Sequence, residues 1–187
     1  GASERTKRNL AAALKEKMAK KSLEQITIQE LTEQCGMQRR TFYYHFEDIY
    51  ALVRWMFQEE AISLLNQREG SLLWQEGLLQ LFHYLDENRA VCLCALRSPG
   101  HDALKRFFGT NLEAIFGKEV EETAARLDLN LDPDGIPLFV SALGGIMESW
   151  LLGVFPDPPE KMVERINGFL ESHIYGMQVL QNRFGQH

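Results

Sequence analysis

The sequence of 187 residues contains few cysteines and prolines, three and six respectively. No stretch reaches the ~18 consecutive apolar residues that a membrane-spanning helix requires, so we expect no membrane segment. Cys35, Cys92 and Cys94 are odd in number and lack zinc-like spacing, which favours reduced thiols in the cytoplasm. With 45% hydrophobic and 25% charged residues, a chain of this length can bury a core without disulfides or metal.

The signatures of common enzyme classes are also missing. The chain has no Ser-His-Asp order, no P-loop and no histidine–carboxylate spacing typical of metal sites. Cys92 and Cys94 are two positions apart, and such positions face different directions on a helix. They are therefore better explained as small apolar residues than as a redox pair. We expect no enzyme activity, no catalytic residues, no cofactor and no metal.

Alternating β-branched runs are almost absent, and helical periodicity takes their place. Leu10, Leu14 and Met18, for example, recur at four-residue spacing on one face. Glycine- and proline-rich breaks near residues 98–100 and 132–135 separate later helices. We therefore expect an all-α fold of about nine helices. Their expected ranges are 4–21, 28–35, 38–44, a long helix from 48, 71–87, 89–97, 100–127, 135–154 and 159–184.

Two short helices near the N-terminus have clear end signals. Thr27 and Glu30 form a capping-box pattern, and Gly36 is placed to end the first helix in a left-handed conformation. A second short helix follows at once, which predicts a helix-turn-helix. We expect a DNA-binding domain over residues 1–46, and a helical regulatory and dimerisation domain over 47–187. The long fourth helix joins the two without a flexible linker.

The charge of the chain is unevenly distributed, although its formal net charge is −6. Residues 1–46 carry nine basic and five acidic residues, a net +4, and the remainder carries a net −10. This asymmetry suggests that the N-terminal part meets a polyanion. Chance clustering of solvated charge is the alternative.

The second short helix carries residues suited to reading DNA. Arg39 and Arg40 lie in its first turn, where guanidinium groups can reach guanine edges, and Thr41 can contact a thymine methyl or a phosphate. Phe42 and Phe46, four apart, are expected to pack inward. Donors for phosphates or base edges are Tyr43, Tyr44 and His45. Each residue alone also suits a solvated or packing role; their combination favours DNA binding.

This segment resembles the TetR family of bacterial transcription regulators. The family pattern is matched by Gly36, Thr41, Phe42, Tyr43, His45 and Phe46, followed by Asp-Ile-Tyr-Ala-Leu at 48–52. The specific match covers about residues 5–57. Residues 39–50 also look like the subgroup that includes activators of dihydroxyacetone kinase operons.

The resemblance implies a homodimer that binds double-stranded operator DNA. Bases or nearby backbone would be contacted by Gln38, Arg39, Arg40, Thr41, Tyr44 and His45. Phosphates would be held by Tyr43, Thr27 and Gln29, the last two at a helix N-terminus. The alternative function is a helical ligand- or protein-binding module that has no operator.

The last two expected helices have apolar stripes that suit dimerisation. One stripe includes Met147 and Leu151, and another includes Ile174 and Met177. Gly168, Ser172 and Gly176 form a small-residue seam at four-residue spacing. These seven residues are the expected dimer interface, although packing within the chain would produce the same stripes.

Aromatic residues are frequent in the expected body. A pocket for an effector is expected to involve Trp55, Trp74, Phe82, His83, Phe107, Phe108, Phe139 and Trp150. A filled core is the alternative explanation, and the effector would then be a partner protein. In either form, a tilt of the long fourth helix would change the distance between the two DNA-reading helices of a dimer.

Overall fold

A computed structural model describes residues 1–67 and 73–185 of the chain. The described residues form nine α-helices and one short 3-10 helix at Leu23–Gln25, with no strand, which confirms the all-α prediction. Positions 71 and 72 of the expected helix 71–87 lie outside the described residues. The helices are α1 (Ala2–Met18), α2 (Ile28–Gln34), α3 (Arg39–His45), α4 (Ile49–Gln67), α5 (Trp74–Glu87), α6 (Arg89–Leu96), α7 (His101–Arg126), α8 (Gly135–Leu151) and α9 (Pro159–Phe184).

The end signals near the N-terminus act as predicted. The Glu30 amide donates to Thr27 Oγ1 at 3.2 Å, and the Thr27 amide donates to Glu30 Oε2 at 2.8 Å, so the capping box is complete. Gly36 has φ +64°, the left-handed conformation that glycine adopts without strain. The Ala51 amide donates to Asp48 Oδ1 at 2.7 Å at the start of α4. Local sequence therefore sets the boundaries of α2 and α4.

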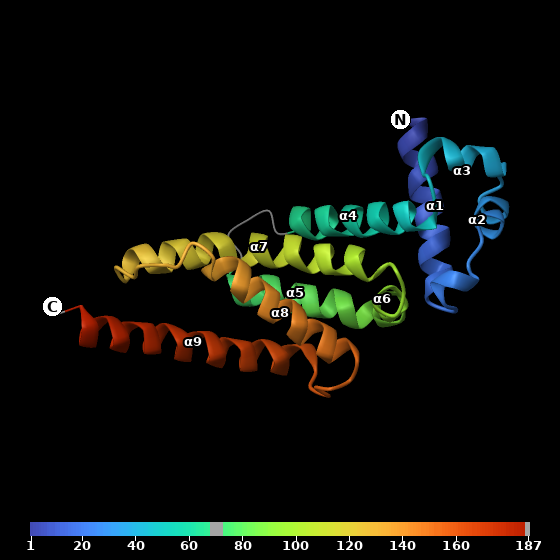
Figure 1. Ribbon diagram of the computed structural model, residues 1–187. Helices are drawn as coiled ribbons and strands as arrows, with labels where there is room; N and C mark the ends of the chain where they lie inside the picture. The colour runs from blue at the N-terminus through green and yellow to red at the C-terminus, as the bar shows by residue number, and fades with distance from the viewer. Residues whose placement is uncertain (68–72, 186–187) are drawn as a thin grey trace.

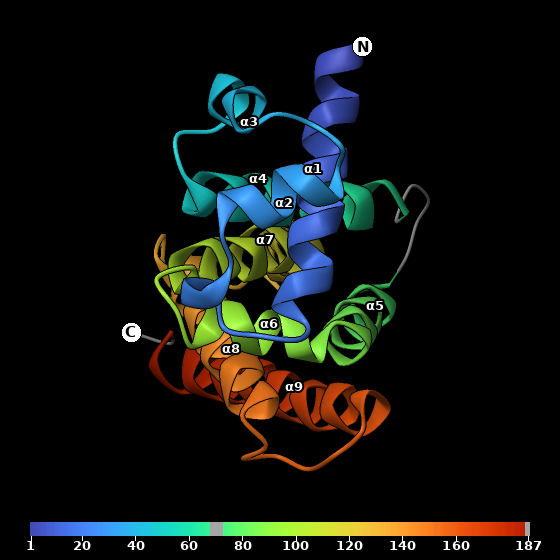
Figure 2. The same cartoon turned by 90° about the vertical axis from the view of Figure 1, so that its right-hand side faces the viewer.

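The helices form a head at one end and an elongated body. Figure 1 shows α1–α3 grouped at one end, with α1 running across the direction of α4. From the head, α4 extends along α7, while α8 crosses the body and α9 lies on the side opposite to α4 (Figures 1 and 2). The DNA-reading helix predicted from sequence is thus far from the end of α9.

One continuous hydrophobic core links the head to the body. Leu10 and Leu14 of α1 belong to the same buried cluster as Leu52 and Phe57 of α4 and Phe107 of α7. Because this core passes through α4, the head is packed on the body rather than tethered to it. The division into a DNA-binding part, residues 1–46, and a regulatory and dimerisation part, residues 47–187, stays a proposal about function.

Four aromatic residues expected in a pocket are part of this core instead. Phe82 packs edge-on against Trp150 at 5.2 Å between ring centroids, and Phe107 lies 6.2 Å from Phe108. All four are at most 2% exposed. The pocket prediction is wrong for them, because neighbouring rings fill the space that a ligand would need.

His83 lies at the surface of the body. Its Nε2 is 3.0 Å from Glu160 Oε1, and the two side chains are well exposed, so this contact joins α5 to the start of α9 at the surface. His83 lines neither of the two cavities described below, and its contact with an effector stays a prediction.

Two residues expected at a dimer interface are buried within the chain. Met147 and Leu151 of α8 are 0% and 2% exposed. The end of α8 is fixed by Arg89, whose Nη1 donates to the carbonyls of Trp150 and Leu151 at 3.3 and 3.1 Å. The predicted stripe on α8 is real, but it faces α7 and the core, so these two residues cannot meet a partner.

Candidate functional site

The outward face of α3 gathers the residues predicted to read DNA. Phe42 is fully buried and Phe46 nearly so, and these two rings anchor α3 to the rest of the head. The opposite face then carries Arg39 and Arg40, both exposed, and Tyr44, which is 84% exposed. The inward and outward assignments made from the four-residue spacing are both confirmed for these residues.

Arg39 is held in place by its neighbour Tyr43. Its Nη2 donates to the Tyr43 Oη at 3.3 Å, and its guanidinium carbon lies 5.8 Å from the ring centroid. Neither Arg39 nor Arg40 forms an ion pair with any residue in the described part of the chain. Two cations on one exposed helical face are therefore available to a polyanion.

The remaining predicted DNA contacts surround this face. Gln38 precedes α3 and is exposed, whereas Thr41 and His45 are half-buried. His45 Nδ1 lies 3.5 Å from Ser3 Oγ, which brings the N-terminus of α1 close to α3.

The N-terminus of α2 is already partly occupied by internal hydrogen bonds. Thr27 Oγ1 takes part in the capping box, and Gln29 Nε2 donates to Glu33 Oε1 at 2.8 Å. Both Thr27 and Gln29 are nevertheless exposed. A phosphate contact from either residue stays a prediction.

Glu30 of the capping box gives the head a dependence on pH. The hydrogen bond from Lys21, followed by that from the Thr27 amide, lowers the pKa of Glu30 from 4.5 to about 2. The stabilisation from its charged form is therefore complete above pH 4.5 and is lost as the pH falls towards 2.

We expect Glu30→Gln to lower the melting temperature at pH 7, and the gap from wild type to narrow as the pH falls below 4.5. Thermal unfolding between pH 7 and the lowest pH at which both proteins fold measures this gap. Glu33→Gln, on the exposed face of the same helix, is the control. A gap that stays constant over this range would contradict the role given to the Glu30 charge.

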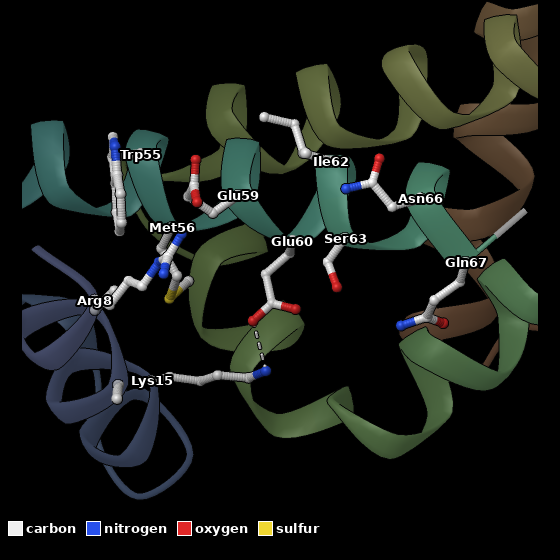
Figure 3. A pocket seen from close by; sticks show the side chains of 12 residues that line it. Arg8, Lys15, Trp55, Met56, Glu59, Glu60, Ile62, Ser63, Asn66 and Gln67 are labelled. Atoms are coloured by element: carbon white, nitrogen blue, oxygen red, sulfur yellow. Dashed lines mark hydrogen bonds and ion pairs between the residues drawn. The ribbon is translucent and has the colours of Figure 1, made fainter. Parts of the chain in front are cut away.

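A cleft between α1 and α4 marks the junction of head and body. Its volume is about 770 Å³, with Arg8 and Lys15 on the α1 side and residues from Trp55 to Gln67 on the α4 side (Figure 3). Lys15 Nζ donates to Glu60 Oε1 at 2.8 Å across the cleft. Trp55 packs on Phe46 at 6.0 Å, so it lies at this junction rather than in the expected body pocket.

A buried tyrosine extends the junction into α5. Lys15 Nζ lies 5.7 Å from the Tyr84 ring centroid, and the Tyr84 hydroxyl has no hydrogen-bond partner among the described residues. Burial, together with the nearby Glu60 carboxylate, raises the pKa of Tyr84. Three helices thus meet around one ion pair, an arrangement that the sequence pattern did not reveal.

We expect Lys15→Ala to lower the free energy of unfolding by about 1–2 kcal/mol, because it leaves a partly buried Glu60 unpaired and uncovers the Tyr84 ring. Lys20→Ala removes a well-exposed ion pair between a residue just after α1 and Glu16 of α1, and it should stay within ~0.5 kcal/mol of wild type. Denaturant unfolding measures both. Equal effects would show that the junction ion pair has no special role.

The far end of the body contains a second cavity, of about 500 Å³, which we call the distal cavity. Its walls come from the start of α5, the second half of α7, the start of α8 and the middle of α9. Trp74 and Phe139, two of the eight residues expected in an effector pocket, line it. Ile174 and Met177 of α9, two of the residues expected at a dimer interface, line it as well.

The outer faces of α8 and α9 carry apolar and small residues that nothing covers. On α8 these are Leu138, Ala142 and Gly145, followed by Leu152 directly after the helix, all exposed. On α9 they are Phe169, Ser172, Tyr175 and Leu180, with Phe169 83% exposed. Gly168 is exposed next to them and Gly176 is half-buried. We call these residues the α8–α9 outer face.

This outer face was only partly predicted from sequence. Gly168, Ser172 and Gly176 were expected there, whereas Leu138 and Phe169 were missed because they lie off the main apolar stripes. The available signal was a large apolar residue on the otherwise polar side of a helix.

These features define a class of protein: a helix-turn-helix head with a basic reading helix, joined by a shared core to an all-α body. Residues 10–56 match the family described as bacterial regulatory proteins of the tetR family, and residues 73–172 match a transcriptional regulator C-terminal region. The chain belongs to the TetR family of bacterial transcription regulators. The matched families consist of regulators rather than enzymes.

Individual relatives agree with this assignment. The chain is 32% identical over 84 residues to the HTH-type dhaKLM operon transcriptional activator DhaS of Lactococcus lactis subsp. lactis, over 45% of each chain. The match thus spans about half the length of that relative. A solved structure named dihydroxyacetone kinase operon activator DhaS superposes with a TM-score of 0.70 and 24% identity, covering 92% of this chain and 97% of that one, which supports the fold.

Two kinds of feature are absent from the described residues. No helix there is both long and apolar enough to cross a membrane. No group of three or more histidine, cysteine or acidic side chains in the same residues is arranged to hold a metal ion.

Proposed function

We propose that this protein binds operator DNA as a homodimer and that an effector bound to the body modulates its DNA affinity. The observation that carries the proposal is the outward face of α3, where Arg39 and Arg40 are exposed without carboxylate partners while Phe42 is fixed in the core. A helix held in this way can enter the major groove with its first turn leading.

Contacts to bases and to phosphates would come from different parts of this surface. Arg39 and Arg40, with Gln38, Thr41, Tyr44 and His45 nearby, would face base edges or the adjacent backbone. Tyr43, Thr27 and Gln29 would hold phosphates around that contact. The net +4 charge of residues 1–46 supports attraction to the DNA backbone.

The α8–α9 outer face is the proposed dimer surface. Its exposed Phe169 and Leu138 would gain stabilisation from burial, and its small residues, such as Gly145 and Gly168, would let two helices approach closely. A two-fold dimer reads a near-palindrome whose half-site centres lie about 34–36 Å apart, or a multiple of that distance.

The effector would act through α4, which packs on α1 in the head and on α7 in the body. The distal cavity supports a small-molecule effector over a partner protein. The Lys15–Glu60 ion pair spans the junction across which a shift of the body would reach the head. A role on chromosomal DNA would place the protein in the bacterial cytoplasm.

The test begins with selection of binding sequences from a pool of random DNA duplexes, followed by mobility shifts at several salt concentrations. We expect a near-palindromic sequence that binds at least 10³-fold more tightly than random DNA at matched salt. A thermal-shift screen of apolar and phosphorylated metabolites, repeated with and without this operator, then identifies effectors. If no sequence is enriched, the protein is a helical binding module without an operator.

A further inference from the structure

The distal cavity has the size and lining of a site for one small molecule. Its volume of about 500 Å³ falls within the usual range for ligand sites. Most of its wall is apolar, including Val120, Ile136 and Leu170 in addition to the aromatic residues. Val120, Ile136 and Leu170 are half-buried and pack against the core, so part of each side chain faces the cavity.

Two aromatic residues, Trp74 and Phe139, line this cavity, and the fully buried Phe116 ring packs against both. The Phe116 ring lies between Trp74 and Phe139, with centroid separations of 5.1 Å to each. Trp74 and Phe116 are buried, and Phe139 is half-buried. Aromatic faces attract cations as well as apolar groups, so this wall accepts a ligand that carries both.

The charged residues that line the cavity are mainly acidic. Its carboxylates are Glu119, Glu121, Asp132 and Glu171. None of the four forms an ion pair with another residue in the described part of the chain. Arg126 is the single guanidinium of the lining, and His173 is its only histidine. An anionic ligand would meet net repulsion there, whereas a cationic ligand would meet net attraction.

We propose that the distal cavity binds a lipophilic cation, a molecule with an aromatic or aliphatic body and a quaternary or delocalised positive charge. The apolar body would lie against Trp74 and Phe139, which the buried Phe116 ring supports from behind, and the charge would be directed to the acidic residues. The claim that this ligand is the effector rests on the proposed function. It disfavours phosphorylated metabolites at this site.

The cavity is linked to the proposed dimer surface by α9. Ile174 and Met177 line the cavity from the inner side of α9, while Phe169 and Tyr175 are exposed on its outer side. Two polar contacts hold this half of α9 to the body: Gln75 Nε2 donates to Asn167 Oδ1 at 3.2 Å, and Gln181 Nε2 donates to the Asp128 carbonyl at 2.6 Å. A ligand that fixes α9 would therefore change dimer affinity, and dimerisation would change ligand affinity by the same factor.

Tetraphenylphosphonium and tetraphenylborate provide the test, because they have nearly the same size and shape and opposite charge. In calorimetric titrations of the full chain at fixed ionic strength, we expect the phosphonium to bind one per chain and the borate at least tenfold more weakly. Equal binding of the two ions, or no binding of the phosphonium at millimolar concentration, would overturn the proposal.

Variants then locate the binding. Glu119→Gln and Glu171→Gln should each weaken phosphonium binding about fivefold, the effect of one charge near 4 Å in a water-like medium. Glu113→Gln, an exposed carboxylate on α7 outside the lining, should leave binding unchanged. Phosphonium affinities that do not differ among these three variants would place the ion elsewhere and overturn the proposal. Circular dichroism confirms that each variant is folded.

Operator binding by the same variants separates the two proposals. We expect Glu119→Gln and Glu171→Gln to bind the selected operator as wild type does when no ligand is present, because neither residue is in the head. If a variant loses phosphonium binding but still binds the operator, the ligand site is assigned to the distal cavity and operator binding is independent of it. Phosphonium binding with no enriched operator would count against the proposed function and leave the ligand class supported.

Discussion

Simultaneous replacement of both recognition-helix arginines, Arg39→Ala with Arg40→Ala, is expected to lower operator affinity by roughly 2–6 kcal/mol, taking ~1–3 kcal/mol for each side chain. Both guanidinium groups are exposed on the α3 face and lack carboxylate partners in the described part of the chain, so their loss leaves the fold intact while removing base contacts. Mobility shifts with the selected operator at matched salt measure the change. Each single variant should also relax base preference at one position of the half-site.

Two further variants test whether this loss is specific. Arg106→Ala removes an exposed cation from α7, far along the chain from the head, and should leave operator affinity unchanged. Tyr43→Phe removes the proposed phosphate donor and the hydrogen bond to Arg39, so it should weaken binding to all sequences about equally. If the double arginine variant binds the operator as tightly as wild type, α3 is not the reading helix.

The second large effect is expected from Phe169→Asp on the α8–α9 outer face. A carboxylate at this position, which is 83% exposed in one chain, would be buried without a partner in a dimer and should produce monomers. Because a monomer reaches only one half-site, its affinity for the full operator should fall by about 10²–10⁴-fold. Light scattering and mobility shifts with full and half operators measure the two parts of this prediction.

The control for this substitution is Val154→Asp. Val154 is exposed in the connection between α8 and α9, away from the repeating outer-face positions, so this variant should stay dimeric. Wild-type protein that is monomeric at micromolar concentration would contradict the dimer proposal. Monomers formed equally by both variants would instead indicate a general loss of structure.

In the head, the ends and the buried face of the short helices could be predicted from local sequence. Thr27, Glu30 and Gly36 set the ends of α2 through hydrogen bonds and backbone conformations only a few residues apart. Phe42 and Phe46 could be assigned inward from their spacing alone, because the rest of α3 is polar or amphipathic. The exposed position of Arg39 and Arg40 follows from that assignment.

In the body, local sequence did not predict what each apolar helix face contacts. The apolar stripe of α8 was correctly found, yet Met147 is wholly buried in the chain while Ala142 and Gly145 are exposed. Met177 was expected to face a partner and lines the distal cavity. Periodicity shows that a helix has an apolar face, but it does not show whether that face meets the same chain, a cavity or a second copy.

The aromatic residues lead to the same conclusion. Phe107 and Trp150 fill the core, Trp55 lies at the head–body junction, and Trp74 and Phe139 line a cavity, although all five are large apolar residues within similar helical patterns. Which of them is packed and which is open to a ligand depends on the separation and crossing of helices distant in sequence.

The sequence by itself determined the helices, their caps, the helix-turn-helix and the basic character of the head, because these depend on side chains within a few positions of one another. Only the tertiary structure decided which face of α8 is internal, where Lys15 meets Glu60, and that α9 separates a cavity from an exposed apolar face. These features depend on how helices from distant parts of the chain pack together, and spacing along one helix carries no information about its neighbours.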